Sequence, residues 1–204
     1  MGFETTPINL TKYGEKYAYR RYGLPHTVNN NMDITNMLIN GWSTLVSGMY
    51  TLDTPQNQGS AVTEFPNFGY GGLGYDAMII QKAWKEFINT GDTLKGVVKF
   101  EYDLVDITRQ AMSDIFTLRY NNFSDSYNKG NITETQNYAD IMIDIINDMN
   151  SILLTNKYWM LGTWIEMARN QTNITSDNND TKNWYEFNAR NQITLWGPNG
   201  QINN

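Results

Sequence analysis

Acidic side chains at helical spacing are the residues of this sequence whose type and pattern come nearest to chemistry. Asp140, Asp144 and Asp148 recur every fourth residue and therefore line one face of a helix. Paired carboxylates act as acid and base when they flank a substrate in a cleft. This stripe, however, lies opposite the apolar residues of its own helix. The pattern therefore favours a solvated helix face over a catalytic site.

Two other acidic residues have a basic residue one helical turn away. Asp106 and Arg109 are three residues apart, and so are Glu166 and Arg169, which predicts two ion pairs within helices. His26 is the only histidine, and the chain has no cysteine. Zinc sites draw on several such ligands, so we expect no metal site and interpret His26 as a hydrogen-bonding surface residue.

A glycine-rich segment, GYGGLG at residues 69–74, matches the pattern G-x-G-x-x-G and precedes a predicted helix. A dinucleotide-binding fold requires a buried strand before this motif and a βαβ unit around it. Pro66 lies in the preceding residues, and no parallel sheet is predicted. We therefore interpret the segment as a flexible loop whose tyrosines, Tyr70 and Tyr75, can face a ligand, and we expect no nucleotide cofactor.

Aromatic residues are abundant, with six Trp and 13 Tyr. Most are expected in the core, because they combine a large apolar area with one polar tip. Trp196 differs, because it precedes Gly197 and Pro198 in a tight loop, where a large ring is awkward to bury. Its position favours stacking on the face of a sugar.

The elements that would position these residues are helices. Apolar residues follow the 3.6-residue period over most of the chain, and no segment alternates for long at the period of a strand. Gly41 and Gly48 weaken the second helix, and residues 51–75 form a long loop of a kind that is often functional. The prediction is an all-α antiparallel helical bundle in one domain, residues 1–204. The expected helices span Asn9–Tyr22, Asp33–Tyr50, Asp76–Thr90, Tyr102–Tyr127, Thr133–Thr155, Tyr158–Arg169 and Lys182–Leu195.

Composition excludes several classes of partner. The net charge is −6 and the pI about 4.7, which argues against a nucleic acid or an anionic membrane surface. No apolar run approaches the roughly 18 residues of a membrane span. The first residues lack the pattern of a signal peptide. Six N-x-[ST] sequons exceed the about four expected by chance only slightly, so a secretory-pathway protein stays an open alternative.

Three motifs, taken in order, resemble one family. They are EYDLVDITRQAM at residues 101–112, YWMLGTWIEMAR at 158–169 and YEFNARNQITLWGPNGQINN at 185–204. Together with YAYRRYGLPH at 17–26, they resemble the C-terminal helical region of the α-N-acetylglucosaminidase family of glycoside hydrolases. The resemblance spans essentially the whole chain.

The resemblance implies a small α/β domain and a catalytic (β/α)8 barrel ahead of this region. Members of the family remove terminal α-linked N-acetylglucosamine, in animals from heparan sulfate in lysosomes. Their retaining mechanism uses two glutamates of the barrel. No residue here corresponds to those glutamates, so no catalytic role passes to Glu4, Glu15, Glu64, Glu86, Glu101, Glu134, Glu166 or Glu186.

The resemblance also implies where this chain would contact substrate. Trp196 would form a wall of the sugar pocket, Arg190 and Asn191 would hold its loop, and Tyr70 and Tyr75 are secondary candidates. The bundle is expected to be incomplete at its C-terminus, and the fragment to be inactive alone. Its expected partners are the barrel and a terminal N-acetylglucosamine, and its expected location is lysosomal or secreted. A free-standing carbohydrate-binding or protein-interaction module is the alternative, and the number of subunits stays open.

Overall fold

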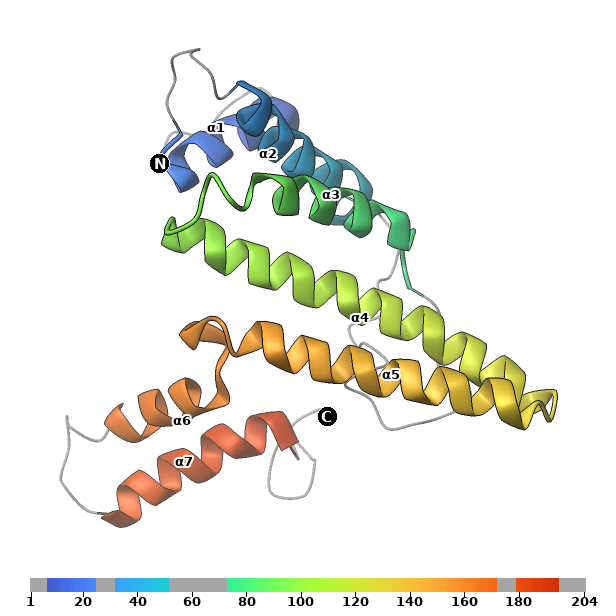
Figure 1. The fold of residues 1–204 in the computed structure, drawn as a ribbon. Coiled ribbons are helices and arrows are strands. Elements are labelled where there is room, and N and C mark those ends of the chain that lie inside the picture. Colours follow the sequence, from blue (N-terminus) through green and yellow to red (C-terminus); the bar gives the residue numbers. More distant parts are fainter. Residues whose placement is uncertain (1–6, 25–31, 52–72, 172–178, 195–204) are drawn as a thin grey trace. The chain divides into compact units, whose positions relative to one another are not determined.

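The computed structural model describes residues 7–24, 32–51, 73–171 and 179–194, and every regular element in these ranges is helical (Figure 1). The all-α prediction is therefore confirmed. The chain divides into two compact units, residues 1–152 and 153–204, which are described separately. A single domain over residues 1–204 stays a prediction. The elements are α1 (Leu10–Tyr22), α2 (Met32–Leu45), a π-helical turn η1 (Val46–Tyr50), α3 (Ala77–Thr90), α4 (Val98–Asn128), α5 (Ile132–Leu153), η3 (Lys157–Trp159), α6 (Leu161–Asn170) and α7 (Asn179–Thr194).

The ends of α1 and α3 follow directly from the local sequence. The Asn9 side chain accepts a hydrogen bond from the Lys12 amide at 3.0 Å and caps α1, as predicted. Gly23 ends that helix with φ = 66°, a left-handed conformation that glycine adopts at little cost. Asp76 caps α3 by accepting from the Met78 amide at 2.9 Å.

The ends of α4 and α5 differ from the prediction by a few residues. α4 begins at Val98, four residues before the predicted start, and Glu101 accepts a hydrogen bond from the Gly96 amide at 2.8 Å. α5 begins with a reciprocal cap. The Asn131 side-chain oxygen accepts a hydrogen bond from the Glu134 backbone amide, and the Asn131 side-chain amide donates to the Glu134 carboxylate. The helix was expected to begin at Thr133, but it begins at Ile132 after the Asn131 cap, because Gly130 with φ = 70° turns the chain just before it.

The core of the first unit forms where α2 crosses α3, with α1 and α4 packed around them (Figure 1). Two glycines permit this close crossing. A Cβ on Gly41 would lie 2.8 Å from the Phe87 ring, and a Cβ on Gly48 would lie 2.7 Å from the Ile79 side chain. Gly41 and Gly48 therefore weaken the intrinsic helix propensity but allow tight packing. The large side chains that are fully buried there include Leu38, Leu45, Ile80, Phe87 and Phe100.

The second unit is a hairpin of α6 and α7 preceded by the short helix η3. The expected helix over residues 158–169 is split in two, because Met160 adopts an extended backbone between η3 and α6. Ile165 and Ala189 are buried between the two helices, and the Trp164 indole donates to the Ala189 carbonyl at 3.3 Å. This hairpin carries the predicted residues Arg190 and Asn191 on the last turns of α7.

Candidate functional site

A buried polar cluster on the first unit joins α1, α2 and α4. Arg21 donates two hydrogen bonds to the Asp103 carboxylate, and the Tyr22 hydroxyl donates a third at 2.8 Å. The Trp42 indole in turn donates to the Tyr22 oxygen at 3.0 Å. Burial, and then the nearby Asp103 charge, raise the pKa of Tyr22 far above its ordinary value, so the phenol keeps its proton. These hydrogen bonds hold α1, α2 and α4 together.

A second cluster contains Tyr75, one of the predicted ligand-facing residues. Its hydroxyl lies 2.9 Å from Oδ2 and 3.0 Å from Oδ1 of Asp114, a residue that is only 1% exposed. The Gln110 amide donates to the same carboxylate at 2.9 Å and to the Tyr75 oxygen at 3.1 Å. Burial raises the pKa of Asp114, while the hydrogen bonds from Tyr75 and Gln110 oppose that rise. Tyr75 is thus anchored to α4 through its hydroxyl.

The end of α7 contains the other predicted residues that the structure describes. Arg190 donates from Nε to the Glu186 carboxylate at 2.8 Å, and Arg169 of α6 contacts the other oxygen of that carboxylate. Hydrogen bonds from Arg190 and Arg169 lower the pKa of Glu186, so it stays ionised in mild acid. Asn191 is 8% exposed, and its side-chain oxygen has no hydrogen-bond partner among the described residues.

The prediction of an ion pair between Glu166 and Arg169 was wrong. Arg169 reaches across the hairpin to Glu186 instead, because α7 presents that carboxylate to it from the side. A cavity of about 470 Å³ lies beside this ion-pair group. Its described lining residues are Leu161, Gly162, Ile165, Glu166, Arg169, Asn170 and Arg190. Arg190 thus lines this cavity, and it lies six residues before Trp196 in the sequence.

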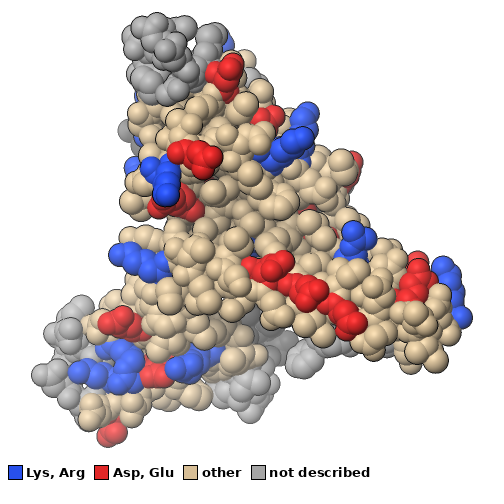
Figure 2. Space-filling view, in the orientation of Figure 1, with Lys and Arg blue, Asp and Glu red and all other residues tan. Residues whose placement is uncertain are grey.

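The remaining sequence predictions divide into confirmed and untested ones. The Asp106–Arg109 ion pair is present at 2.8 Å. Asp140, Asp144 and Asp148 are all exposed, as predicted, and Figure 2 shows acidic side chains in a row over α5. Trp196, Tyr70 and His26 lie outside the described residues. The predicted substrate contacts of Trp196, Arg190, Asn191, Tyr70 and Tyr75 stay predictions.

The described parts of the chain contain neither a metal-binding group of side chains nor a membrane-spanning helix. No three acidic or histidine side chains gather there in an arrangement that could hold a metal ion. None of the helices described has the length and apolar character that a membrane crossing requires.

Comparison with known proteins identifies the family of this chain. Residues 13–204 match the model of the family described as alpha-N-acetylglucosaminidase (NAGLU) C-terminal domain. Human alpha-N-acetylglucosaminidase is 24% identical over 208 residues, an alignment that covers 99% of this chain and 26% of the human protein.

Solved structures agree with that match. A family 89 glycoside hydrolase from Clostridium perfringens, in complex with 2-acetamido-1,2-dideoxynojirimycin, is 28% identical with a TM-score of 0.78, over 93% of this chain and 22% of the enzyme. The same organism's family 89 enzyme in complex with its substrate GlcNAc-alpha-1,4-galactose is 27% identical, with a TM-score of 0.77 over 93% of this chain and 21% of that enzyme. The chain thus spans about a quarter of the length of these relatives. By its family match, its fold and its ordered motifs, this protein belongs to the family of α-N-acetylglucosaminidase C-terminal domains.

Proposed function

We propose that this chain is the helical-domain portion of an α-N-acetylglucosaminidase, which removes terminal α-linked N-acetylglucosamine from glycans such as heparan sulfate. In that enzyme the chain supports the catalytic barrel and lines one side of the sugar pocket. The two catalytic glutamates belong to the barrel, so the chain alone is inactive. A lysosomal or secreted location is part of the same proposal.

The observation that carries the supporting role is the apolar surface of the α6–α7 hairpin. Trp184 is 62% exposed and stacks on Phe187, with ring centroids 5.8 Å apart. Trp164, Met167 and Ile193 of the same hairpin are also exposed. Large apolar side chains grouped on a surface are typical of an interface. The occupant we infer is the barrel, because this chain covers only 26% of its human relative.

The side-chain oxygen of Asn191, which has no hydrogen-bond partner among the described residues, supports the sugar-pocket part of the proposal. A buried carbonyl oxygen without a partner costs free energy unless it accepts a hydrogen bond. The segment that carries Trp196 begins four residues later and contains backbone amides that can donate to it. Arg190 is fixed by Glu186, so the two residues can hold the loop while the Trp196 ring contacts the sugar. Tyr70 and Tyr75 are the secondary contacts.

The DNA on both sides of the coding sequence provides the first test. We expect a reading frame for a (β/α)8 barrel upstream and further helices downstream. The protein expressed from the longer frame should hydrolyse a chromogenic α-N-acetylglucosaminide, and the 204-residue chain should not. Turnover by the purified 204-residue chain would contradict the proposal. Clean start and stop codons around a cooperative, monomeric chain would favour the free-standing binding module instead.

A substitution in the longer protein tests the sugar-contact role separately. Trp196→Ala should lower kcat/KM about tenfold or more, because stacking on the sugar is lost. Trp196→Phe retains a ring and should recover most of the rate. Equal rates for Trp196→Ala and the unchanged enzyme would exclude Trp196 as a pocket wall.

A further inference from the structure

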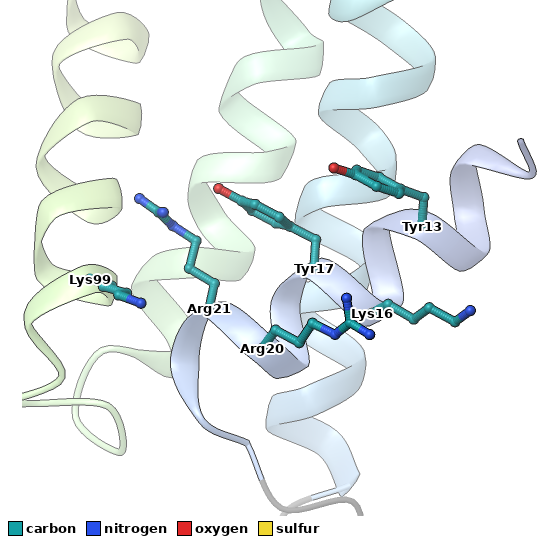
Figure 3. A pocket seen from close by; sticks show the side chains of 6 residues that line it. All are labelled: Tyr13, Lys16, Tyr17, Arg20, Arg21 and Lys99. Atoms are coloured by element: carbon teal, nitrogen blue, oxygen red, sulfur yellow. The ribbon is translucent and has the colours of Figure 1, made fainter. Parts of the chain in front are cut away.

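One face of α1 forms a pocket that the proposed function does not use. Tyr13, Tyr17 and Arg21 lie four residues apart along that face, and Lys16 and Arg20 lie four residues apart beside them. Lys99 projects from the start of α4 toward the C-terminal end of this face (Figure 3). These six residues line a cavity of about 290 Å³.

The charge of this pocket is opposite to that of the protein. Four cations and no carboxylate appear among its described lining residues, although the chain carries a net charge of −6. The Arg21 charge is compensated by Asp103. Lys16, Arg20 and Lys99 make no ion pair with any described residue, so three positive charges stay available.

Asp103 compensates Arg21, and the acidic residues nearest in sequence to the other cations, Glu15 and Glu101, face elsewhere. Glu15 is offset by two residues from both Tyr13 and Tyr17, which places it about 200° around the helix from those rings. Glu101, two residues beyond Lys99, is exposed and accepts the hydrogen bond from the Gly96 amide. The pocket therefore attracts anions locally, even though the whole protein does not.

The two tyrosine rings give the pocket an apolar surface of fixed shape. Tyr13 and Tyr17 lie nearly parallel, with an interplanar angle of 19° and centroids 6.5 Å apart. Tyr17 makes an edge-to-face contact with Trp42, with ring centroids 5.0 Å apart. The Arg21 guanidinium carbon lies over the Tyr17 ring, 5.5 Å from its centroid. Tyr13 is 57% exposed, so the platform is open to solvent on its outer side. Figure 3 shows both rings projecting from α1 in the same direction.

A small inorganic anion would use the cations but would leave the rings without a contact. A sugar ring with an acidic group uses both, because its C–H face stacks on an aromatic ring while guanidinium and ammonium groups donate to the acid. We propose that this pocket binds an acidic sugar, which is a pyranose that carries a carboxylate or a sulfate ester. Lys16 and Arg20 donate to the acidic group, Tyr13 supports the ring, and Lys99 and Arg21 bound the far end.

This site lies on α1 in the first unit, whereas the predicted sugar-contact residues Arg190, Asn191 and Trp196 come from the second. The inference uses the geometry of α1 and α4 alone and does not depend on glycosidase activity. If the longer protein showed no glycosidase activity, the acidic-sugar proposal would still stand. If this pocket bound no acidic sugar, the proposed function would still stand.

Binding to the purified 204-residue chain tests the proposal directly. The probes are a disaccharide that carries a uronate, a disaccharide that carries a sulfate ester, the neutral parent disaccharide, and inorganic sulfate. Calorimetry or NMR titration at low ionic strength should show binding of at least one acidic disaccharide. The neutral disaccharide and inorganic sulfate should bind more weakly by about tenfold or more. Comparison of the two acidic disaccharides shows whether the pocket binds a carboxylate or a sulfate ester more tightly. Affinity should fall as salt is added, because the cations are exposed.

Matched variants locate the binding. The double substitution Lys16→Gln and Arg20→Gln should weaken binding about tenfold or more, and Tyr13→Leu should weaken it several-fold. The double substitution Lys82→Gln and Lys85→Gln removes the same charge from exposed positions on α3 and should leave binding unchanged. Circular dichroism confirms that each variant is folded. Equal binding of the neutral disaccharide, equal binding of inorganic sulfate, or an equal loss in the α3 variant would each overturn the proposal.

Discussion

Arg21 and Asp103 form a two-bonded ion pair between α1 and α4, although they lie 82 residues apart in the sequence. Asp103 is 6% exposed, and its carboxylate also accepts from the Tyr22 hydroxyl. A buried charge is tolerated only when such partners compensate for the lost hydration. This pair therefore fixes the position of α1, and with it the face that carries the tyrosines and the free cations.

Removal of the Asp103 carboxylate should destabilise the first unit strongly. Asp103→Ala leaves the Arg21 guanidinium and the Tyr22 hydroxyl without their acceptor, so we expect a loss of about 3 to 5 kcal/mol in the free energy of unfolding. Asp106→Ala is the control on the same helix, since its pair with Arg109 is solvent-exposed and should contribute about 1 kcal/mol or less. Urea unfolding followed by circular dichroism measures both. Similar losses would show that the Arg21–Asp103 pair has no special role.

Two glycines in helices should respond oppositely to the same substitution. Gly41→Ala places a Cβ against the Phe87 ring and should cost about 1 to 3 kcal/mol, because α2 and α3 must move apart. Gly14→Ala on α1 meets no described side chain within 4 Å and should stabilise the protein by about 0.5 to 1 kcal/mol. Thermal unfolding of the two variants gives the comparison. A stabilising Gly41→Ala would contradict the close crossing of α2 and α3.

The Asp114 carboxyl should make stability depend on pH in a defined direction. Its pKa is raised in the folded state above the ordinary value of 3.8, so folding favours the protonated form. Its contribution is therefore most favourable below about pH 3.8 and declines as the pH rises through the folded-state pKa. Asp114→Asn removes this titration. As the pH rises from acid to neutral, the free energy of unfolding of the unchanged protein should therefore fall more than that of the variant.

Urea titrations of the two proteins at pH 4 and pH 7 measure that difference. The Asn side chain can still accept from Tyr75 or Gln110, so the variant is expected to fold. Asp148→Asn is the control, since it removes an exposed carboxyl from α5. The interpretation would be contradicted if the unchanged protein gained stability relative to Asp114→Asn from pH 4 to pH 7. An equal change for Asp148→Asn would likewise show that burial of Asp114 is not the cause.

The exposed rings of the α6–α7 hairpin should bind hydrophobic dyes. We expect the purified chain to enhance the fluorescence of such a dye, and Trp184→Gln with Phe187→Gln to reduce that enhancement by about half or more. Stability should change by about 0.5 kcal/mol or less, because neither ring is part of a core. Phe87→Ala is the contrasting variant, since it opens the buried core and should raise dye binding while costing about 3 to 5 kcal/mol. An unchanged signal in the hairpin variant would place the apolar surface elsewhere.

Local signals in the sequence were sufficient for most of the secondary structure. Asn9, Gly23 and Asp76 act as the caps that their types predict, because a cap uses only backbone groups within a few residues. The exposed stripe of Asp140, Asp144 and Asp148 followed from the period of α5. The pair of Asp106 with Arg109 is equally local, since both side chains lie on one turn.

Side-chain partners between different helices could not be predicted in this way. The local spacing favoured Glu166 for Arg169, but the packing of α7 on α6 brought Glu186 closer. No local signal indicated that the Tyr75 hydroxyl lies against Asp114, 39 residues further along the chain. The ligand contact of Tyr75 stays a prediction.

The sequence by itself therefore determined the all-α class, the helix ends marked by Asn9, Gly23 and Asp76, and, through its ordered motifs, the family. Those properties depend on short-range periodicity and on residue identity. Only the tertiary structure decided which charges are compensated and which stay free. Arg21 and Arg20 are adjacent and identical in type, yet the packing of α1 on α4 directs one to Asp103 and leaves the other at an open pocket. That difference arises from helix packing, because adjacent residues on a helix point about 100° apart and meet different neighbours.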